Sequence, residues 1–299
     1  DDSIRAVPVG KTGVMCMYYN KALYRRAGLD PETKPRHWKE LLDVCGKLKE
    51  KGIQPFVIGE KEGYNSAWVL GQLWMDLTGI QGILDIRDGK RKFSDDSGLK
   101  EAYGLWSSLF NMGYTNSDVI STTQEEGQAR FLKGEAAMEV GSSWTAKDVY
   151  AYLGEDAGWF PYPHTRRDAP FVNTYCGGFS GYNFVVTNYS SYPDESVRFI
   201  KYMTSSNTQD WCVEESQWEF SNNVDSREPV LDNNPILQEM YVFMKTTPLK
   251  AMPVWDNILQ IDLCYEMYQV SSLVFSGKIS VEEALVKLDE SYKTIVGSN

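Results

Sequence analysis

The residues of this sequence best suited to binding chemistry are aromatic side chains in loops. Tryptophan and tyrosine present an apolar face and a polar tip, which suits ligands that are apolar on one side and rich in hydroxyl groups around the rim. The loop aromatics that follow expected strands or glycine-rich turns are Tyr64, Trp68, Trp144, Tyr175, Phe179 and Trp255. In open α/β sheets such loops gather at the carboxyl ends of the strands, where ligands bind.

Trp144 is the strongest of these candidates. It follows the turn Gly141-Ser142-Ser143, directly after an expected strand at 136–140. A short turn of small residues presents a ring more readily than it buries one. For Trp68 and Trp255 the alternative, packing into the core, stays open.

Motifs for enzyme chemistry are absent from the sequence. It contains no GxSxG, HExxH, Walker or GxGxxG pattern. The two histidines, His37 and His164, have no identifiable acidic partner, so we interpret them as ordinary surface residues. Glu60 and Glu62 precede Tyr64, and a glycosidase needs two carboxyl groups about 5–10 Å apart, but a sequence cannot show such pairing. Glu62 is retained as a candidate ligand-binding residue, and no cofactor or metal is predicted.

Composition limits the possible partners. The chain has 299 residues, 42% of them hydrophobic and 13% aromatic, with a formal net charge of -11. Its most basic runs, at 47–51 and 87–92, are interrupted by acidic or turn residues, which excludes nucleic acid as the main partner. No run approaches the ~20 apolar residues of a membrane span. The five cysteines form no CxxC motif, so we expect buried thiols, with one disulfide left possible.

The elements that must position these loops alternate between strands and helices, which predicts α/β layers. Short apolar runs predict strands at 53–58, 136–140, 159–163 and 182–187. Helical periodicity predicts helices at 34–51, 65–77, 98–110, 122–132, 145–153, 193–203, 208–215, 236–244, 257–275 and 280–295. Capping boxes are expected at Thr122–Glu125 and Ser280–Glu283.

Four stretches, taken in order, carry a resemblance to a known family. They are AVPVG…GVMCMYYNKALYRRAGLDPETKPRHWKELLDVCGKLKEKGIQPF, ARFLKGEAAMEVGSSW, FSGYNFVVTN and FSGKISVEEALVKLDE. Together they cover nearly the whole chain. The sequence resembles the extracellular solute-binding proteins of ABC importers, in the carbohydrate-binding group that includes the maltodextrin-binding protein.

The resemblance implies an α/β fold of the periplasmic-binding-protein type II kind, with two lobes joined by hinge crossings around a ligand cleft. In that family on the order of a hundred residues precede the first crossing strand, most of a domain, so we expect the N-terminal lobe to be truncated here. The expected division is a C-terminal lobe at 13–176 plus 236–299, a remnant of the N-terminal lobe at 1–10 plus 181–230, and hinges near 10–13, 177–181 and 230–236.

The resemblance also implies a site and partners. Trp144 lies where the family places a tryptophan that stacks on a sugar ring, and Tyr64 matches an aromatic residue after the second strand. Gly178 and Phe179, with Gly177, fall at the cleft floor, and Trp255 lies near a cleft aromatic. The expected partners are a small-molecule carbohydrate, the importer's transmembrane permease subunits and the missing segment of the N-terminal lobe.

The expected location of the full-length protein is extracellular, lipid-anchored at the cell surface or periplasmic, and the expected role is binding rather than catalysis. Two alternatives stay open. One is the same fold binding a polyamine or a metal–anion complex, and the other is a glycan-active enzyme.

Overall fold

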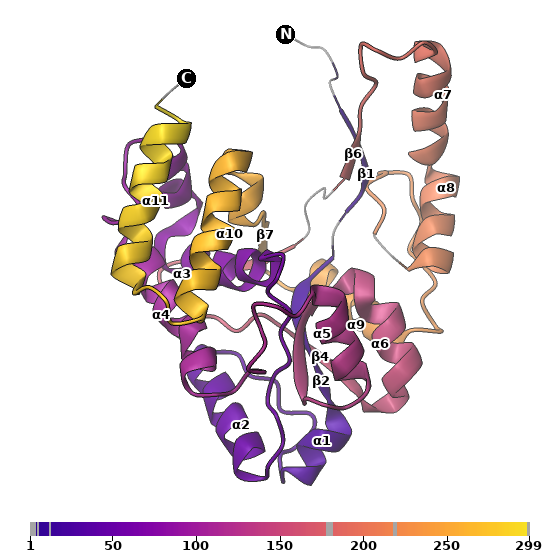
Figure 1. The fold of residues 1–299 in the computed structure, drawn as a ribbon. Helices are drawn as coiled ribbons and strands as arrows, with labels where there is room; N and C mark the ends of the chain where they lie inside the picture. Colours follow the sequence, from indigo (N-terminus) through magenta and orange to yellow (C-terminus); the bar gives the residue numbers. More distant parts are fainter. Residues whose placement is uncertain (1–3, 5, 12, 178–181, 218–219, 298–299) are drawn as a thin grey trace.

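The structure is a computed structural model in which two bodies of unequal size are joined (Figure 1). It describes residues 4, 6–11, 13–177, 182–217 and 220–297. The small body comprises β1 (Val7–Gly10), β6 (Tyr182–Phe184), α7 (Pro193–Met203) and α8 (Ser206–Trp211). Most other elements form the large body. Within the described ranges, no helix combines the length and the apolar character needed to cross a membrane.

A three-stranded antiparallel sheet of order β3-β2-β4 lies at the centre of the large body. Its strands are β2 (Met15–Asn20), β3 (Met138–Ser142) and β4 (Ala157–Pro161). Every residue of β2 is buried, and its side chains alternate between two hydrophobic cores, with Met15, Met17 and Tyr19 in the first and Cys16 and Tyr18 in the second. Because successive side chains of a strand point to opposite faces, this one strand forms part of both cores.

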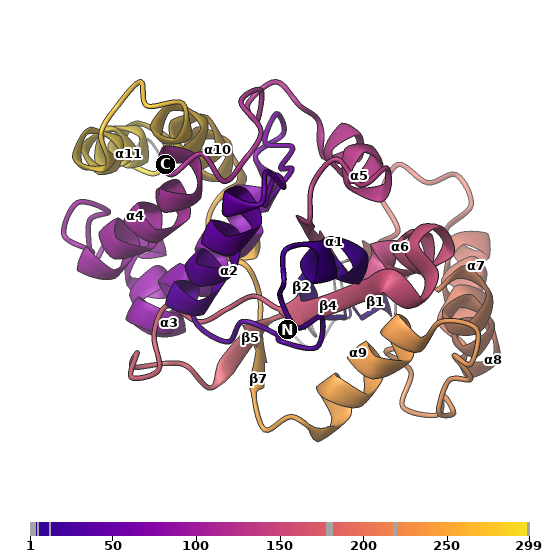
Figure 2. The same ribbon diagram turned by 90° about the horizontal axis from the view of Figure 1, so that it is seen from below.

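Helices cover each core. The first core is enclosed by α2 (Trp38–Glu50), α3 (Tyr64–Arg87), α4 (Ser97–Asn111), α10 (Ile261–Phe275) and α11 (Val281–Ile295). The second core is enclosed by α5 (Gln124–Leu132), α6 (Ala146–Leu153) and α9 (Pro235–Thr246). The remaining regular elements are α1 (Lys21–Arg26) and a parallel pair, β5 (Thr174–Cys176) with β7 (Lys250–Met252). Figure 2 shows β4, β5, β7 and α9 together on the underside of the molecule. The predicted α/β class is confirmed.

Two of the local predictions need correction. The segment 53–58 was expected to be a strand, but it forms a single bridge, between Phe56 and Met138. Two backbone N–H groups of this segment donate to the loop after α4 rather than to a neighbouring strand. Phe56 N donates to Tyr114 O (2.8 Å) and Ile58 N donates to Asn116 Oδ1 (2.8 Å). The helix expected at 65–77 continues to Arg87, through a kink at Gly79.

One capping box is confirmed and the other is shifted. Ser280 and Glu283 begin α11 as predicted. The box before α5 uses Thr123 and Glu126, one residue later than expected. Thr122 belongs to the preceding turn instead, where its hydroxyl donates to the carbonyl of Asp118 (2.9 Å) and accepts from Asn116 Nδ2 (3.4 Å).

Three connections between the bodies lie side by side. Lys11 and Phe220 exchange two backbone hydrogen bonds, of 2.7 and 3.0 Å, and Val14 bridges with Gly177. Gly177 has a φ of 129°, and a Cβ there would lie 2.0 Å from the carbonyl oxygen of Gly13. Only glycine therefore allows this approach. Lys11, Gly13 and Gly177 belong to the predicted hinge ranges 10–13 and 177–181, whose residues 12 and 178–181 lie outside the described residues, so the hinges stay a prediction.

The last of these connections is tied to both bodies through two adjacent charged residues. The Arg227 guanidinium donates to Glu214, in the turn that ends α8 (2.6 Å). The Glu228 carboxylate accepts from Lys245 Nζ (2.8 Å) and from the Tyr241 hydroxyl, both on α9. Because exposed ion pairs are each worth about 0–1 kcal/mol, they position this segment more than they stabilise the fold.

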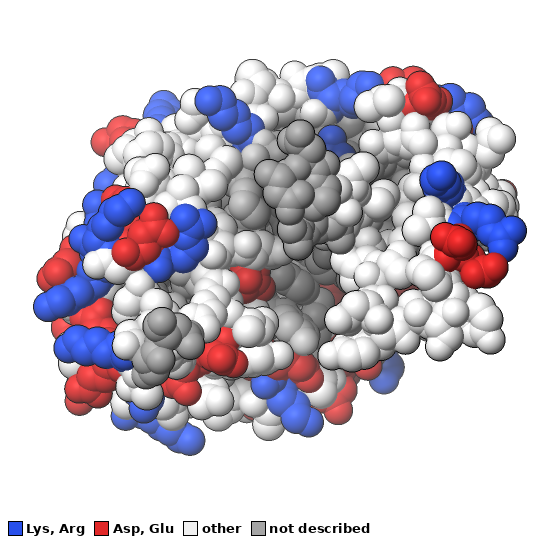
Figure 3. Space-filling view, turned by 90° about the horizontal axis from the view of Figure 1, so that it is seen from above, with Lys and Arg blue, Asp and Glu red and all other residues white. Residues whose placement is uncertain are grey.

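The small body exposes apolar side chains. None of the residues of α7 is buried, and two of its large apolar side chains, Phe199 and Tyr202, are 54% and 65% exposed. Trp211 at the end of α8 is 63% exposed. Figure 3 shows that much of the surface over the small body, at the right of that view, carries no Lys, Arg, Asp or Glu. Patches of this kind in soluble proteins mark surfaces that contact another molecule.

We therefore expect the chain to bind a hydrophobic dye and to self-associate through this face. Replacing both Phe199→Ser and Trp211→Ser should lower dye fluorescence and shift sedimentation toward the monomer. Tyr152→Ser is the matched control, because Tyr152 is 72% exposed but lies on α6 in the large body. A monomeric chain that binds no dye before any substitution contradicts this prediction.

Candidate functional site

Aromatic residues from separate parts of the chain meet in one cluster. We define the aromatic cluster as Tyr64, Trp68, Trp144, Trp255, Tyr265 and Tyr268. Tyr64 stacks on Trp68 (centroids 6.2 Å apart, planes at 12°), and Trp68 meets Trp144 edge to face (5.4 Å, 78°). Tyr268 contacts Tyr64 (6.1 Å), Trp255 (5.4 Å) and Tyr265 (6.2 Å). Four of the predicted site residues, Tyr64, Trp68, Trp144 and Trp255, thus lie in one continuous cluster.

Local backbone geometry brings these rings together. Tyr64 begins α3 immediately after Gly63, which has a φ of 82°. A Cβ on Gly63 would lie 2.6 Å from the Cβ of Tyr268, so glycine is required both for the turn and for the contact. Trp144 lies in a short 3-10 turn, Ser143–Thr145, directly after β3. Ser143 fixes this turn to the first crossing, because Ser143 N donates to Val14 O (3.1 Å).

The rings of the cluster divide into an exposed part and a supporting part. Tyr64 and Tyr265 are 45% and 57% exposed, and Trp144 is half-buried. Trp68 and Trp255 are buried, at 8% and 0% exposure. The exposed rings can present a face to a ligand, whereas Trp68 and Trp255 hold those rings in place from below. A direct ligand contact by Trp255 would require its ring to become uncovered.

A partly buried acid, Asp256, contacts the cluster. The Tyr268 hydroxyl donates to Asp256 Oδ2 (2.7 Å). Burial raises the pKa of Asp256, and burial together with the neighbouring Asp256 charge raises the pKa of Tyr268. Their hydrogen bond orients Tyr268, the ring that contacts three other members of the cluster.

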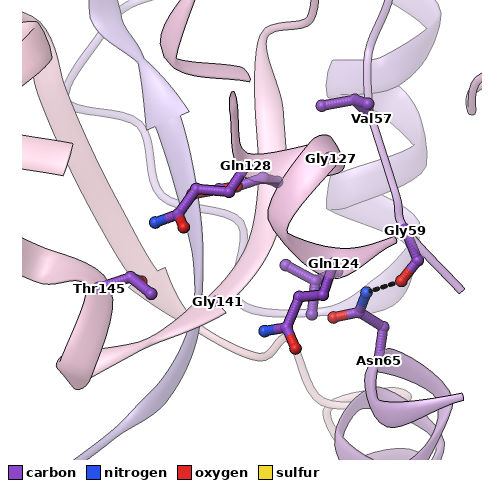
Figure 4. Close-up of a pocket in the computed structure, with 10 residues that line it drawn as sticks. Val57, Gly59, Asn65, Gln124, Gly127, Gln128, Gly141 and Thr145 are labelled. Atoms are coloured by element: carbon purple, nitrogen blue, oxygen red, sulfur yellow. Dashed lines mark hydrogen bonds between the residues drawn. The ribbon is translucent and has the colours of Figure 1, made fainter. Parts of the chain in front are cut away.

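Residues that follow two of the cluster rings in the chain help to line a small polar recess (Figure 4). It has a volume of about 10 Å³ and lies between β3, α5 and the start of α3. Its polar lining comes from Asn65, Gln124, Gln128, Glu139 and Thr145, and it contains no Lys or Arg. Asn65 follows Tyr64 in the chain and Thr145 follows Trp144, so the recess and the exposed rings are built from the same two turns.

The other predicted site residues lie elsewhere or make different contacts. Glu62 accepts a hydrogen bond from Gln124 N at the start of α5 (3.1 Å). Tyr175 is buried in β5 with its ring against Phe243 of α9 (5.6 Å), apart from the aromatic cluster. Gly178 and Phe179 lie outside the described residues, so their predicted role stays a prediction. Within the described residues, no group of three or more His, Cys, Asp and Glu could hold a metal ion.

Sequence reasoning missed several residues of this site. Tyr265 and Tyr268 are spaced i, i+3 on a helix that the periodicity predicted, so their common face could have been found. Glu139 gave a weaker signal, which is a charged residue inside the apolar run Ala136–Val140. Gln124 and Gln128 lie one turn apart on α5, and only the fold shows which face of that helix meets β3.

Comparison with known proteins identifies the class. The sequence model of the family "Bacterial extracellular solute-binding protein" matches residues 1–210, so the chain belongs to that family. Among curated relatives, it is similar to the sn-glycerol-3-phosphate-binding periplasmic proteins of Shigella flexneri (30% identical over 177 residues) and Escherichia coli K12 (29%). Each match covers 55% of this chain and 37% of the relative, so the matched part spans well under half of those proteins.

Solved structures share the fold. A chitin oligosaccharide binding protein superposes with a TM-score of 0.83 at 23% identity, covering 98% of this chain and 72% of that one. A sugar transporter from Bacillus licheniformis, in complex with stachyose, gives a TM-score of 0.75 at 16% identity, covering 97% and 73%. The fold is therefore that of the type II periplasmic solute-binding proteins, as the sequence motifs implied.

Glu60, just before the Tyr64 turn, should make stability depend on pH. Its carboxyl group is fully buried and accepts from Ser66 N (3.2 Å). Burial raises the pKa of Glu60 to about 7, against about 4.3 in an unfolded chain. Between these values the folded state holds a proton that the unfolded state has lost. The free energy of unfolding therefore falls as the pH rises through this window, by on the order of 3 kcal/mol.

The substitution Glu60→Gln should remove this contribution. The free energy of unfolding of the variant should exceed that of the unchanged chain at about pH 8, and the two should differ little at about pH 5. Urea denaturation at both pH values measures this difference. The same difference at both pH values would show that Glu60 is ionised in the folded protein.

Proposed function

We propose that this chain is the ligand-binding component of an ABC importer and that it binds a sugar or an oligosaccharide at the aromatic cluster. The observation that carries this proposal is the meeting of three exposed or half-exposed rings, Tyr64, Trp144 and Tyr265, beside a polar recess. An aromatic ring stacked on the apolar face of a pyranose contributes about 1 kcal/mol beyond area burial, by analogy with aromatic pairs. Amide and hydroxyl side chains such as Gln124 and Thr145 would pair with the sugar hydroxyls.

The charge of the site favours an uncharged ligand over a phosphate ester. Three acids line the recess or contact residues of the recess and the rings, namely Glu62, Glu139 and Asp256. A bound phosphate needs Lys, Arg or converging backbone donors, and the recess offers neither cation. Although the curated relatives are named for sn-glycerol-3-phosphate, this chemistry supports a glycan, and the structural neighbours described above are named for chitin oligosaccharide and stachyose.

Binding without catalysis fits the carboxyl groups best. Glu60 is fully buried, and Glu62 caps the start of α5, so neither is free to act on a substrate. The relatives are named as binding proteins, which supports the same role. Within this proposal, the lobe division at 13–176 plus 236–299 and 1–10 plus 181–230 describes the parts that close on the ligand. Permease subunits would be the partners, at the cell surface or in the periplasm, with a lipid anchor as one means of attachment.

Trp144→Ala tests the site. We expect affinity for the preferred glycan to fall about tenfold or more, equivalent to about 1.4 kcal/mol, because the exposed stacking face is lost. The measurement is calorimetric titration with chitin, xylan and raffinose-type oligosaccharides and with glycerol 3-phosphate. Trp211→Ala, which removes an exposed tryptophan of the small body, is the matched control and should leave affinity unchanged.

The ligand panel also separates the alternatives. Tight binding of glycerol 3-phosphate with no heat from any glycan overturns the carbohydrate proposal. Turnover of a glycan, abolished by a single carboxylate substitution, would establish an enzyme instead.

A further inference from the structure

Glu139 is an acidic residue in a place where packing alone would favour an apolar one. It lies in the middle of β3 and is 4% exposed. Its neighbours Met138 and Val140 point into the first core, so Glu139 points to the opposite face, toward α5. Among the described residues no Lys, Arg or His pairs with it, and its Oε1 atom has no hydrogen-bond partner. An unpaired buried carboxyl group is unfavourable for folding, so its presence calls for a functional explanation.

Two more unpaired polar atoms belong to the same recess. Gln128 Nε2, from α5, and Asn65 Oδ1, from the start of α3, are buried and have no partner. The orientation of Asn65 is fixed, because its Nδ2 donates to the carbonyl of Gly59 (2.5 Å), the bond drawn in Figure 4. Its Oδ1 atom is therefore left as an acceptor. Three elements thus contribute unsatisfied hydrogen-bonding atoms to the lining of the recess, where the Gln128 amide lies on the side of Thr145 and the Asn65 amide lies beside Gly59 (Figure 4).

The size of the recess limits what can occupy it. A volume of about 10 Å³ holds about one non-hydrogen atom with its hydrogen atoms, such as a water molecule or a hydroxyl group. It is too small for a phosphate or carboxylate group. The partly exposed side chains of Gln124, Gln128 and Thr145 form its mouth, and Thr145 directly follows Trp144. A ligand stacked on the exposed rings would therefore lie next to this opening.

We propose that the recess is a subsite for a single hydroxyl group of the bound sugar, with Glu139 as its specificity-determining residue. The inference rests on the proposed function. In this arrangement the ligand oxygen accepts hydrogen bonds from the Glu139 carboxyl O–H and from Gln128 Nε2. One hydroxyl group would satisfy both of these unpaired atoms, so a sugar that lacks it would leave them buried and unpaired.

The surroundings of Glu139 favour its protonated form. The titratable groups that face it are Cys16 and Tyr18 on β2 and Tyr162 after β4. Burial raises the pKa of each of these groups and raises the pKa of Glu139 well above its usual range. None of them supplies a positive charge that would stabilise the ionised carboxylate, so the surroundings favour the protonated carboxyl group, which can donate.

The test combines protein variants with deoxy sugars. The best-binding glycan of the panel and its monodeoxy analogues are titrated into the unchanged chain, Glu139→Leu and Gln128→Ala. One deoxy analogue should bind the unchanged chain at least about tenfold more weakly than the parent glycan. The same analogue and the parent should bind Glu139→Leu with affinities within about twofold of each other, because the partner of that hydroxyl is gone. Glu60→Gln is the matched control, a nearby buried acid that does not line the recess, and should discriminate like the unchanged chain.

The pH dependence of affinity gives a second readout. With Glu139 as donor, affinity for the parent glycan should fall as the pH rises through the titration of Glu139, and Glu139→Gln should abolish this fall. An affinity that rises with pH would indicate an amino group held by the ionised carboxylate and would overturn the hydroxyl assignment. The inference fails if a glycan binds and Glu139→Leu and Gln128→Ala lose the same affinity for each deoxy analogue as the unchanged chain does. In that case the recess holds only water. If no glycan binds, the proposed function fails first.

Discussion

The burial of β2 on both faces is the constraint on which the rest of the structure depends. Its alternating side chains belong to two cores, so a change at any position affects one of two separate sets of helices. The same strand pairs with β3 and β4, which places the turn carrying Trp144 and the start of the first crossing within hydrogen-bond distance of each other. A shift of one residue in the register of β2 would exchange the two sets of side chains, so this register is strongly specified. The position of the candidate site therefore follows from the packing of a strand whose residues belong neither to the aromatic cluster nor to the lining of the recess.

The sequence predicted the helices better than the strands. Long amphipathic segments such as α4 and α11 carry their own period of apolar residues and their own caps, so local information was sufficient. The strands are short, and residues 53–58 show why they are harder to predict. Whether an extended segment becomes a strand depends on which distant groups take its backbone hydrogen bonds, and here a loop near residue 116 takes part of them. The order of family motifs, by contrast, conveyed the long-range arrangement that periodicity cannot.

The candidate site shows the same division. Trp144 and Tyr64 were accessible from sequence because each follows a glycine-containing turn, and the structure places both at an exposed edge of the aromatic cluster. Tyr175 had a similar local context, yet the pairing of β5 with β7 turns its ring toward α9. Residues such as Gln128 and Glu139 are far apart in the chain, and their convergence depends on the packing of α5 on β3. Spacing in the sequence identifies which residues could serve a site, whereas tertiary packing decides which of them do.

The adjacent residues Arg227 and Glu228 bear on how the two bodies can move. In extended chain, neighbouring side chains point in opposite directions, and here one holds the end of α8 while the next holds α9. A single peptide unit therefore links the two bodies, while the close Gly13–Gly177 contact lies at the other two connections. Both anchors are ion pairs that salt screens. Raising the ionic strength would weaken both anchors together, so the stiffness of this connection depends on the salt concentration.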